Sequence, residues 1–196
     1  MSRQIKSRSR VAAYGEVFTA RRQVSDMLNL IPDTLPLDAT FLEPACGTGN
    51  FIDDIIRRKL RLIQTHDPQE CRILAARAVA SVYGVDIQKD NVEETRDRIL
   101  RIVSTFYKKQ TGRVPDAMLL KTVRNLTNRN ILCGNTLTMQ ADDGSPLTFC
   151  EWMIYPDGRI RCREVLFADM IEHNGESTRY IAAHHYRWLM EQRKAA

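Results

Sequence analysis

The residues best suited to chemistry lie between Phe41 and Phe51, in the stretch FLEPACGTGNF. An apolar run ends at the acid Glu43, and Gly47 and Gly49 follow in a turn that leads into a segment with helical spacing. Glycine lets the backbone approach a ligand closely, and the first turn of a helix presents free N–H groups. The combination of strand, glycine turn and helix N-terminus predicts a pocket for a nucleotide-like ligand.

A second acid, Asp86, ends the apolar stretch VYGVDI, where a carboxylate can accept both ribose hydroxyls of a nucleoside. The separation of Gly49 and Asp86 exceeds the ~20 residues of a dinucleotide fingerprint. Phe51 and Ile52 replace the later positions of the Gly-x-Gly-x-x-Gly pattern, and no Lys-Ser or Lys-Thr follows the glycines. The sequence therefore disfavours a dinucleotide oxidoreductase and excludes a P-loop.

The elements that must position these residues alternate between helix and strand over the first 135 residues. Apolar spacing predicts helices over 16–31, 51–63, 69–81, 91–107 and 116–126, and strands over 40–42, 82–87 and 130–133. This order predicts an α/β fold of the Rossmann-like class, with a parallel sheet, helices on both of its faces and the ligand at the carboxyl ends of the strands.

The remainder of the chain changes character. Alternation of apolar and polar residues over 147–155 and 159–167, with the turn signal Asp157-Gly158 between them, predicts a β-hairpin. A helix is expected over 178–193. We expect a flexible basic arm over 1–14 and a single domain over 15–196, divided into a cofactor-binding core (15–137), a hairpin region (138–176) and a C-terminal helix (177–196).

Composition narrows the class of protein. The five cysteines are scattered and include no Cys-x-x-Cys pair, which predicts free thiols in a reducing, cytoplasmic setting rather than disulfides or a zinc site. No apolar run approaches the ~20 residues of a membrane span, so no membrane partner is expected. The net charge of +5 permits binding to nucleic acid without requiring it.

Four segments together resemble the class I S-adenosylmethionine-dependent methyltransferases, and more narrowly the N6-adenine DNA methyltransferases of restriction–modification systems. They are GEVFTARRQVSDML (15–28), LEPACGTGNF (42–51), YGVDI (83–87) and NILCGNTL (130–137). The resemblance covers about residues 15 to 137. Ala20 stands where the family usually has proline, and Asn135 stands where it often has aspartate.

The resemblance implies S-adenosylmethionine as cofactor and DNA as a partner. It assigns Thr19 to the methionine carboxylate region, and Glu43 with the backbone from Ala45 to Gly49 to the methionine moiety. It assigns Asp86 to the ribose, Ile87 to the adenine ring and Asn135 to the adenine amino group. The implied cofactor-binding set is thus Thr19, Glu43, Pro44, Ala45, Cys46, Gly47, Gly49, Asp86, Ile87 and Asn135, with no metal. For Asn135, a left-handed turn residue after Gly134 is the alternative.

One family feature is missing. N6-adenine methyltransferases carry an Asn/Asp-Pro-Pro-Tyr/Phe tetrapeptide that binds the flipped base, whereas no Pro-Pro pair occurs in this sequence. The nearest candidate, Tyr155-Pro156-Asp157-Gly158, reads as a turn. The catalytic residues therefore stay unknown. Two hypotheses remain: a DNA adenine methyltransferase, with or without a partner subunit, or an inactive binding or regulatory subunit acting in restriction or anti-restriction.

Two further groups of polar residues have structural interpretations. His184 and His185 are expected in mid-helix, where neighbours point about 100° apart and cannot share one site. Arg159, Arg161 and Arg163 alternate along a predicted strand and share one face, where they either follow phosphates or protect an edge strand.

Overall fold

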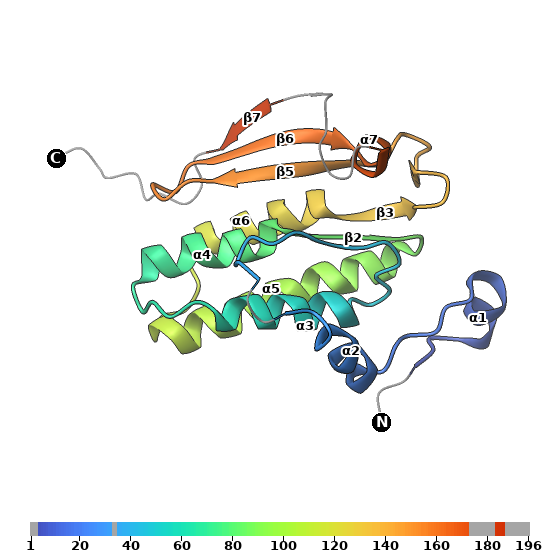
Figure 1. Cartoon of the computed structure of the whole chain (residues 1–196), viewed down its shortest axis with the longest axis horizontal. Helices are drawn as coiled ribbons and strands as arrows, with labels where there is room; N and C mark the ends of the chain where they lie inside the picture. Colours follow the sequence, from blue (N-terminus) through green and yellow to red (C-terminus); the bar gives the residue numbers. More distant parts are fainter. Residues whose placement is uncertain (1–3, 33–34, 173–182, 187–196) are drawn as a thin grey trace.

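The computed structural model describes residues 4–32, 35–172 and 183–186 (Figure 1). Its helices are α1 (Arg8–Tyr14), α2 (Arg21–Leu28), α3 (Asn50–Arg61), α4 (Pro68–Ala80), α5 (Lys89–Thr111), α6 (Ala117–Asn130) and α7 (Phe167–Glu172). Its strands are β1 (Phe41–Glu43), β2 (Val82–Asp86), β3 (Ile131–Asn135), β4 (Gln140–Ala141), β5 (Thr148–Ile154), β6 (Ile160–Leu166) and β7 (Ala183–Tyr186). None of the described helices is long and apolar enough to cross a bilayer.

The first sheet has the order β1-β2-β3-β4, with β1, β2 and β3 parallel and β4 antiparallel to β3. Its register places Glu43 beside Gly84 and Asp86 beside Cys133, so the loops that follow these strands meet at one edge. The chain is therefore α/β with a mixed sheet, an arrangement compatible with a Rossmann-like fold.

The helices α3 and α5 lie on one face of this sheet, whereas in the described structure the other face is covered by the second sheet and the short helix α7. The predicted layer of helices is therefore found on one face, and mainly a sheet takes its place on the other. The strands follow one another in a single direction, and crossovers of one hand then place α3 and α5 on the same side. Val82 belongs to the core on that side, whereas Tyr83 and Val85 pack with Phe149 and Phe167 on the other. The second sheet, of order β5-β6-β7, covers this other face (Figure 1).

The predicted hairpin is confirmed. Its strands β5 and β6 pair antiparallel, and the turn closes with the Gly158 N–H donating to the Tyr155 carbonyl at 2.9 Å. Gly158 has a φ of 83°, a left-handed conformation that glycine adopts without strain. The stretch 155–158 is therefore a turn, as its sequence predicts.

The prediction of a C-terminal helix is wrong for the part of that segment that the structure describes. Residues 183–186, including the two adjacent histidines, form strand β7 and pair with β6. Hydrogen bonding to the free edge of β6 overrides a helical pattern of local sequence. The rest of the predicted helix, and most of the region 177–196, lies outside the described residues.

A disulfide joins Cys150 and Cys162, so the prediction of five free thiols is wrong. Cys150 lies opposite Glu164 and Cys162 lies opposite Trp152, which makes the cysteines diagonal neighbours on one face of the hairpin. Their Cα atoms are 5.6 Å apart. Cys46, Cys71 and Cys133 are free. The disulfide therefore removes the basis for inferring a reducing compartment from the cysteines.

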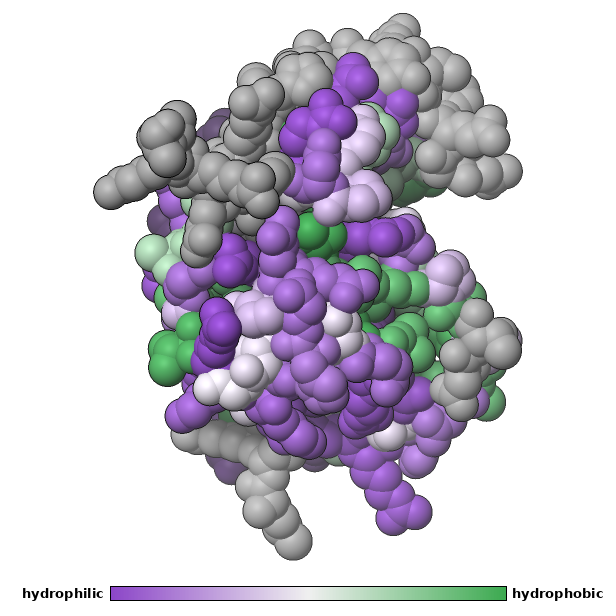
Figure 2. Space-filling view, turned by 90° about the vertical axis from the view of Figure 1, so that its left-hand side faces the viewer, coloured by the Kyte–Doolittle hydropathy of each residue, from purple (hydrophilic) through white to green (hydrophobic). Residues whose placement is uncertain are grey.

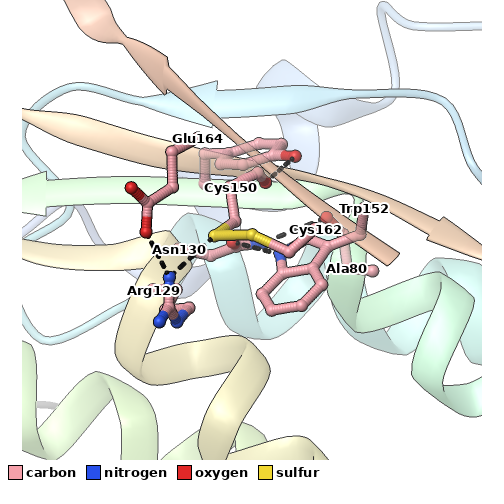
Figure 3. The surroundings of a disulfide bond; sticks show 8 residues. Ala80, Arg129, Asn130, Cys150, Trp152, Cys162 and Glu164 are labelled. Carbon is pink, nitrogen blue, oxygen red and sulfur yellow. Dashed lines mark hydrogen bonds and ion pairs between the residues drawn. A yellow bond between two sulfur atoms is a disulfide. The ribbon is translucent and has the colours of Figure 1, made fainter. Parts of the chain in front are cut away.

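Polar contacts attach the hairpin to the first sheet and its helices (Figure 3). The indole Nε1 of Trp152 donates to Asn130 Oδ1 at 2.7 Å, and Asn130 Nδ2 donates to the Ala80 carbonyl at 3.0 Å. The Tyr83 hydroxyl donates to the Cys150 carbonyl at 2.9 Å.

Figure 2 views the end at the left of Figure 1, where hydrophilic side chains predominate and hydrophobic ones gather at mid-height.

Part of the segment predicted as an arm forms a helix. Residues 8–14 form α1, with the Ser7 hydroxyl accepting a hydrogen bond from the Arg10 N–H at its start. Gly15 ends the helix in a left-handed conformation with a φ of 64°. Local capping at both ends explains why this short basic segment folds as a helix.

Candidate functional site

The loop after β1 is held in place by contacts to the two neighbouring elements. The Cys46 N–H donates to the Val85 carbonyl at 2.8 Å, and Thr95 Oγ1 on α5 donates to the Gly47 carbonyl at 3.1 Å. Gly49 has a φ of 82°, and a Cβ there would lie 2.7 Å from Thr95 Oγ1. Only glycine therefore fits the end of this loop.

Asp86 fixes the same loop from β2. Its Oδ2 accepts from the Gly47 N–H at 2.8 Å, and its Oδ1 accepts from the Gln88 N–H at 2.8 Å and from Asn91 Nδ2 at 3.0 Å. A carboxylate has about four acceptor positions, so three are already used. Asp86 thus has a strong structural role beside the predicted role toward ribose.

Glu43 occupies the carboxyl end of β1. Its Oε1 accepts a hydrogen bond from the Ala45 N–H at 3.2 Å. Burial raises the pKa of the Glu43 carboxyl, because removal from water disfavours the charged form. A cation close to this group would stabilise its ionised state.

The segment before α2 closes the site from the N-terminal side. The ring of Phe18 lies so close to Gly47 that a Cβ there would meet it at 3.0 Å. The Thr19 carbonyl accepts from Asn50 Nδ2 at 2.9 Å, which ties this segment to the first turn of α3. The segment 15–28 and the glycine loop, matched separately in sequence, are therefore adjacent in space.

The loop after β3 completes the edge. The side-chain Oδ1 of Asn135 accepts from the Leu137 N–H at 2.9 Å, so Asn135 organises its own turn. Asn135 has a side-chain role in a turn, but its backbone is part of β3 rather than left-handed. Ile87 is half-exposed and offers an apolar surface at the site.

These three loops and the N-terminal segment enclose a cavity of about 720 Å³. Nine of the ten sequence-predicted cofactor residues line it, and Gly49 does not. The lining residues are Tyr14, Gly15, Glu16, Val17, Phe18, Thr19, Glu43, Pro44, Ala45, Cys46, Gly47, Thr48, Asn50, Phe51, Asp86, Ile87, Gln88, Asn91, Gly134, Asn135, Thr136 and Leu137. The structure therefore brings the predicted residues together at the carboxyl ends of the parallel strands.

The charge of this wall is one-sided. Glu16, Glu43 and Asp86 supply carboxylates, and none of the described lining residues is Lys, Arg or His. Arg10, which lies outside the lining, pairs with Glu16 at 2.7 Å and leaves Glu43 and Asp86 as the carboxylates without an ion pair among the described residues. A second cavity, of about 860 Å³, lies between the hairpin and the amino ends of β1 and β2. Its lining has charged residues of both signs, including Arg77 and Asp38, which form an ion pair at 2.6 Å. Only the first cavity combines unbalanced charge with the loops at the strand ends.

Sequence reasoning did not single out Glu16 and Asn91 as site residues. Asn91 is almost fully buried on α5 and donates to both Glu16 and Asp86. Glu16 lies inside the segment 15–28, next to Gly15, so its acidity was a usable signal. Nothing in the local sequence marks Asn91, because its role depends on how α5 packs.

Several basic residues of α3 are engaged in contacts within the protein. Arg57 pairs with Asp53, and Arg58 lies 3.2 Å from Asp54 while donating to backbone carbonyls at the end of α2. Lys59 is buried and donates to the Leu37 and Ala39 carbonyls. These side chains stabilise the helical layer rather than forming an open phosphate-binding patch.

The arginine stripe of the hairpin likewise lies away from an edge. Strand β6 is central between β5 and β7, so edge protection is wrong as its explanation. Arg159 lies 2.6 Å from Asp157, and Arg163 pairs with Glu151. Among the described residues, no cluster of three or more His, Cys, Asp or Glu could hold a metal ion.

No family model, no curated protein and no solved structure matches the chain.

Proposed function

We propose that this cavity binds S-adenosylmethionine and that the chain is a methyltransferase-like protein related to the DNA adenine N6-methyltransferases. The observation that carries the proposal is the acidic wall in which Glu43 and Asp86 have no ion pair among the described residues, while the third lining carboxylate, Glu16, is paired with Arg10. The chain as a whole has a net charge of +5, so this wall is a local feature and not a consequence of composition. Such a site favours a nucleoside that carries positive charge.

S-adenosylmethionine fits this requirement because it carries a sulfonium and an ammonium group together with one carboxylate. Phosphate-bearing ligands do not fit. Two like unit charges repel by about 3 kcal/mol at roughly 6 Å with an effective dielectric constant of about 20. Glu43 and Asp86 would therefore oppose the phosphates of a dinucleotide or nucleoside triphosphate, and no described lining side chain is basic.

The residues suit separate parts of the ligand. Glu43 and the glycine loop would hold the methionine moiety, with Thr19 near its carboxylate. Asp86 would face the ribose, and the half-exposed Ile87 would pack on the adenine ring. Asn135 would lie near the adenine amino group. These assignments follow the family resemblance and agree with the positions of the residues around one cavity.

If the protein is active, it transfers a methyl group to DNA adenine. The alternative is a cofactor-holding binding or regulatory subunit, and two observations favour it. The sequence contains no Pro-Pro pair, and among the described strands β1 has β2 as its one neighbour. In doubly wound sheets the ligand lies where the strand order reverses, with strands on both sides. A partner chain that adds the second half would supply the missing groups.

Calorimetric titration with S-adenosylmethionine tests the proposal, followed in the same preparation by methyl transfer to unmethylated DNA. Binding with transfer supports the enzyme, and binding without transfer supports the cofactor-holding subunit. Titration with ATP serves as the matched control, since it contains the same adenosine moiety with opposite charge. Absence of heat with S-adenosylmethionine would reject both forms of the proposal.

A further inference from the structure

The segment that precedes α2 is fastened across the cavity by charged contacts to α5. Lys6 Nζ lies 2.9 Å from Asp90 and 3.2 Å from Glu94. The Arg10 guanidinium donates to both oxygens of Asp90, at 2.8 and 3.0 Å. The Phe18 N–H donates to the Gln4 carbonyl at 2.7 Å, which closes the segment on itself. Residues 4–19 thus form a strap whose far end lines the cavity.

Glu16 is the acidic residue that this strap brings into the cavity wall. Its side chain is 8% exposed, and its Oε1 accepts from Arg10 at 2.7 Å and from Asn91 Nδ2 at 2.8 Å. Its Oε2 is buried and has no hydrogen-bond partner, and the same holds for Asn91 Oδ1. Buried acceptors without partners are costly, so both oxygens would gain from a hydrogen-bond donor that the described residues do not supply.

The orientation of Asn91 is fixed by its surroundings. Its Nδ2 donates to Glu16 Oε1 and to Asp86 Oδ1, whereas an inverted amide would place its oxygen against both carboxylates. The two carboxylates therefore lie within hydrogen-bond distance of one nitrogen. Because three acceptor positions of Asp86 are used within the protein, Glu16 and Asn91 offer the free acceptors beside it.

We propose that Glu16 Oε2 and Asn91 Oδ1 accept hydrogen bonds from the ribose hydroxyls of the bound nucleoside, and that Asp86 mainly positions Asn91 and the glycine loop. This inference rests on the proposed function, because it names the contacts of the same cavity. It makes Glu16 the determinant of preference for ribose over deoxyribose. It also makes the strap part of the binding site, since Glu16 is delivered by the segment that Lys6 and Arg10 hold in place.

The test compares adenosine with 2′-deoxyadenosine by calorimetry, using the full chain and its Glu16→Gln variant. We expect the wild type to bind adenosine about tenfold more tightly, the factor given by one hydrogen bond of typical strength. Glu16→Gln should reduce this ratio to about twofold or less. Glu93→Gln is the matched control, because it removes an exposed carboxylate of α5 that does not line the cavity, and it should keep the wild-type ratio.

The outcomes separate the inference from the proposed function. A wild-type ratio that persists in Glu16→Gln overturns the inference and leaves the proposed function intact. Absence of binding by the wild type to both nucleosides and to S-adenosylmethionine overturns both. Hydrogen exchange of residues 4–19 in the wild type gives a measurement that needs no variant. Added adenosine should slow exchange in this strap, and unchanged exchange at saturation contradicts the inference.

Discussion

Gly49→Ala is expected to destabilise the protein far more than the same change at another left-handed glycine. Gly49 has a φ of 82°, which costs alanine about 1–2 kcal/mol. The added Cβ would lie 2.7 Å from Thr95 Oγ1 and 2.9 Å from Thr95 Cγ2. Thr95 is fully buried, so the overlap costs about 1–3 kcal/mol more. Loss of its hydrogen bond to the Gly47 carbonyl adds about 1 kcal/mol. The expected loss in free energy of unfolding is about 3–6 kcal/mol.

Gly112→Ala provides the control within the same chain. Gly112 has a φ of 69°, and no atom lies within 4 Å of an added Cβ, so alanine there costs only the backbone strain of about 1–2 kcal/mol. In a chain of this size, each kcal/mol of lost stability should lower Tm by about 2–4 °C, as measured by thermal denaturation. Adding Thr95→Ala to Gly49→Ala should recover part of the loss. Equal effects at Gly49 and Gly112, or strict additivity with Thr95→Ala, would refute the steric reasoning.

Two further predictions concern stability and pH. Reduction of the disulfide between Cys150 and Cys162, which are 12 residues apart, should lower the free energy of unfolding by about 3 kcal/mol. Denaturation with and without reductant measures this loss. A double variant with Cys150→Ser and Cys162→Ser that is insensitive to reductant but as stable as wild type would contradict the prediction. Burial raises the pKa of Glu43 above its value in the unfolded chain, so the protonated carboxyl group is the form that favours the folded state. This contribution to stability is complete at acid pH and is lost as the pH rises through the folded pKa. Glu43→Gln should therefore raise Tm of the unliganded protein at pH 7 but not at pH 3.5, while weakening S-adenosylmethionine binding by about 1.5–3 kcal/mol. A lower Tm at pH 7, or unchanged affinity, would argue against this account of Glu43.

The loops around the cavity were predictable because their signals are local. An apolar run that ends in an acid and is followed by Gly47 and Gly49 specifies a strand and a tight turn before a helix. Since parallel strands share the edge at which they end, Asp86 and Asn135 had to lie near that turn. The cavity confirms that these residues are neighbours. Their ligand stays a prediction.

The remaining features depend on pairing between distant segments. The disulfide could have been anticipated only from the register of the hairpin, because Cys150 and Cys162 carry no spacing signal of their own. Strand β7 exists through its pairing with β6, which local periodicity does not report. Asn91 was missed for a similar reason, since its two carboxylate partners come from separate parts of the chain.

Calorimetric titration of the purified chain with S-adenosylmethionine and, separately, with ATP tests the central claim most directly. The acidic wall of Glu16, Glu43 and Asp86 predicts saturable binding of S-adenosylmethionine and no measurable binding of ATP at the same concentrations. Weaker binding of S-adenosylhomocysteine, which lacks the sulfonium charge, should accompany it. No binding of S-adenosylmethionine, or tighter binding of ATP, would contradict the account.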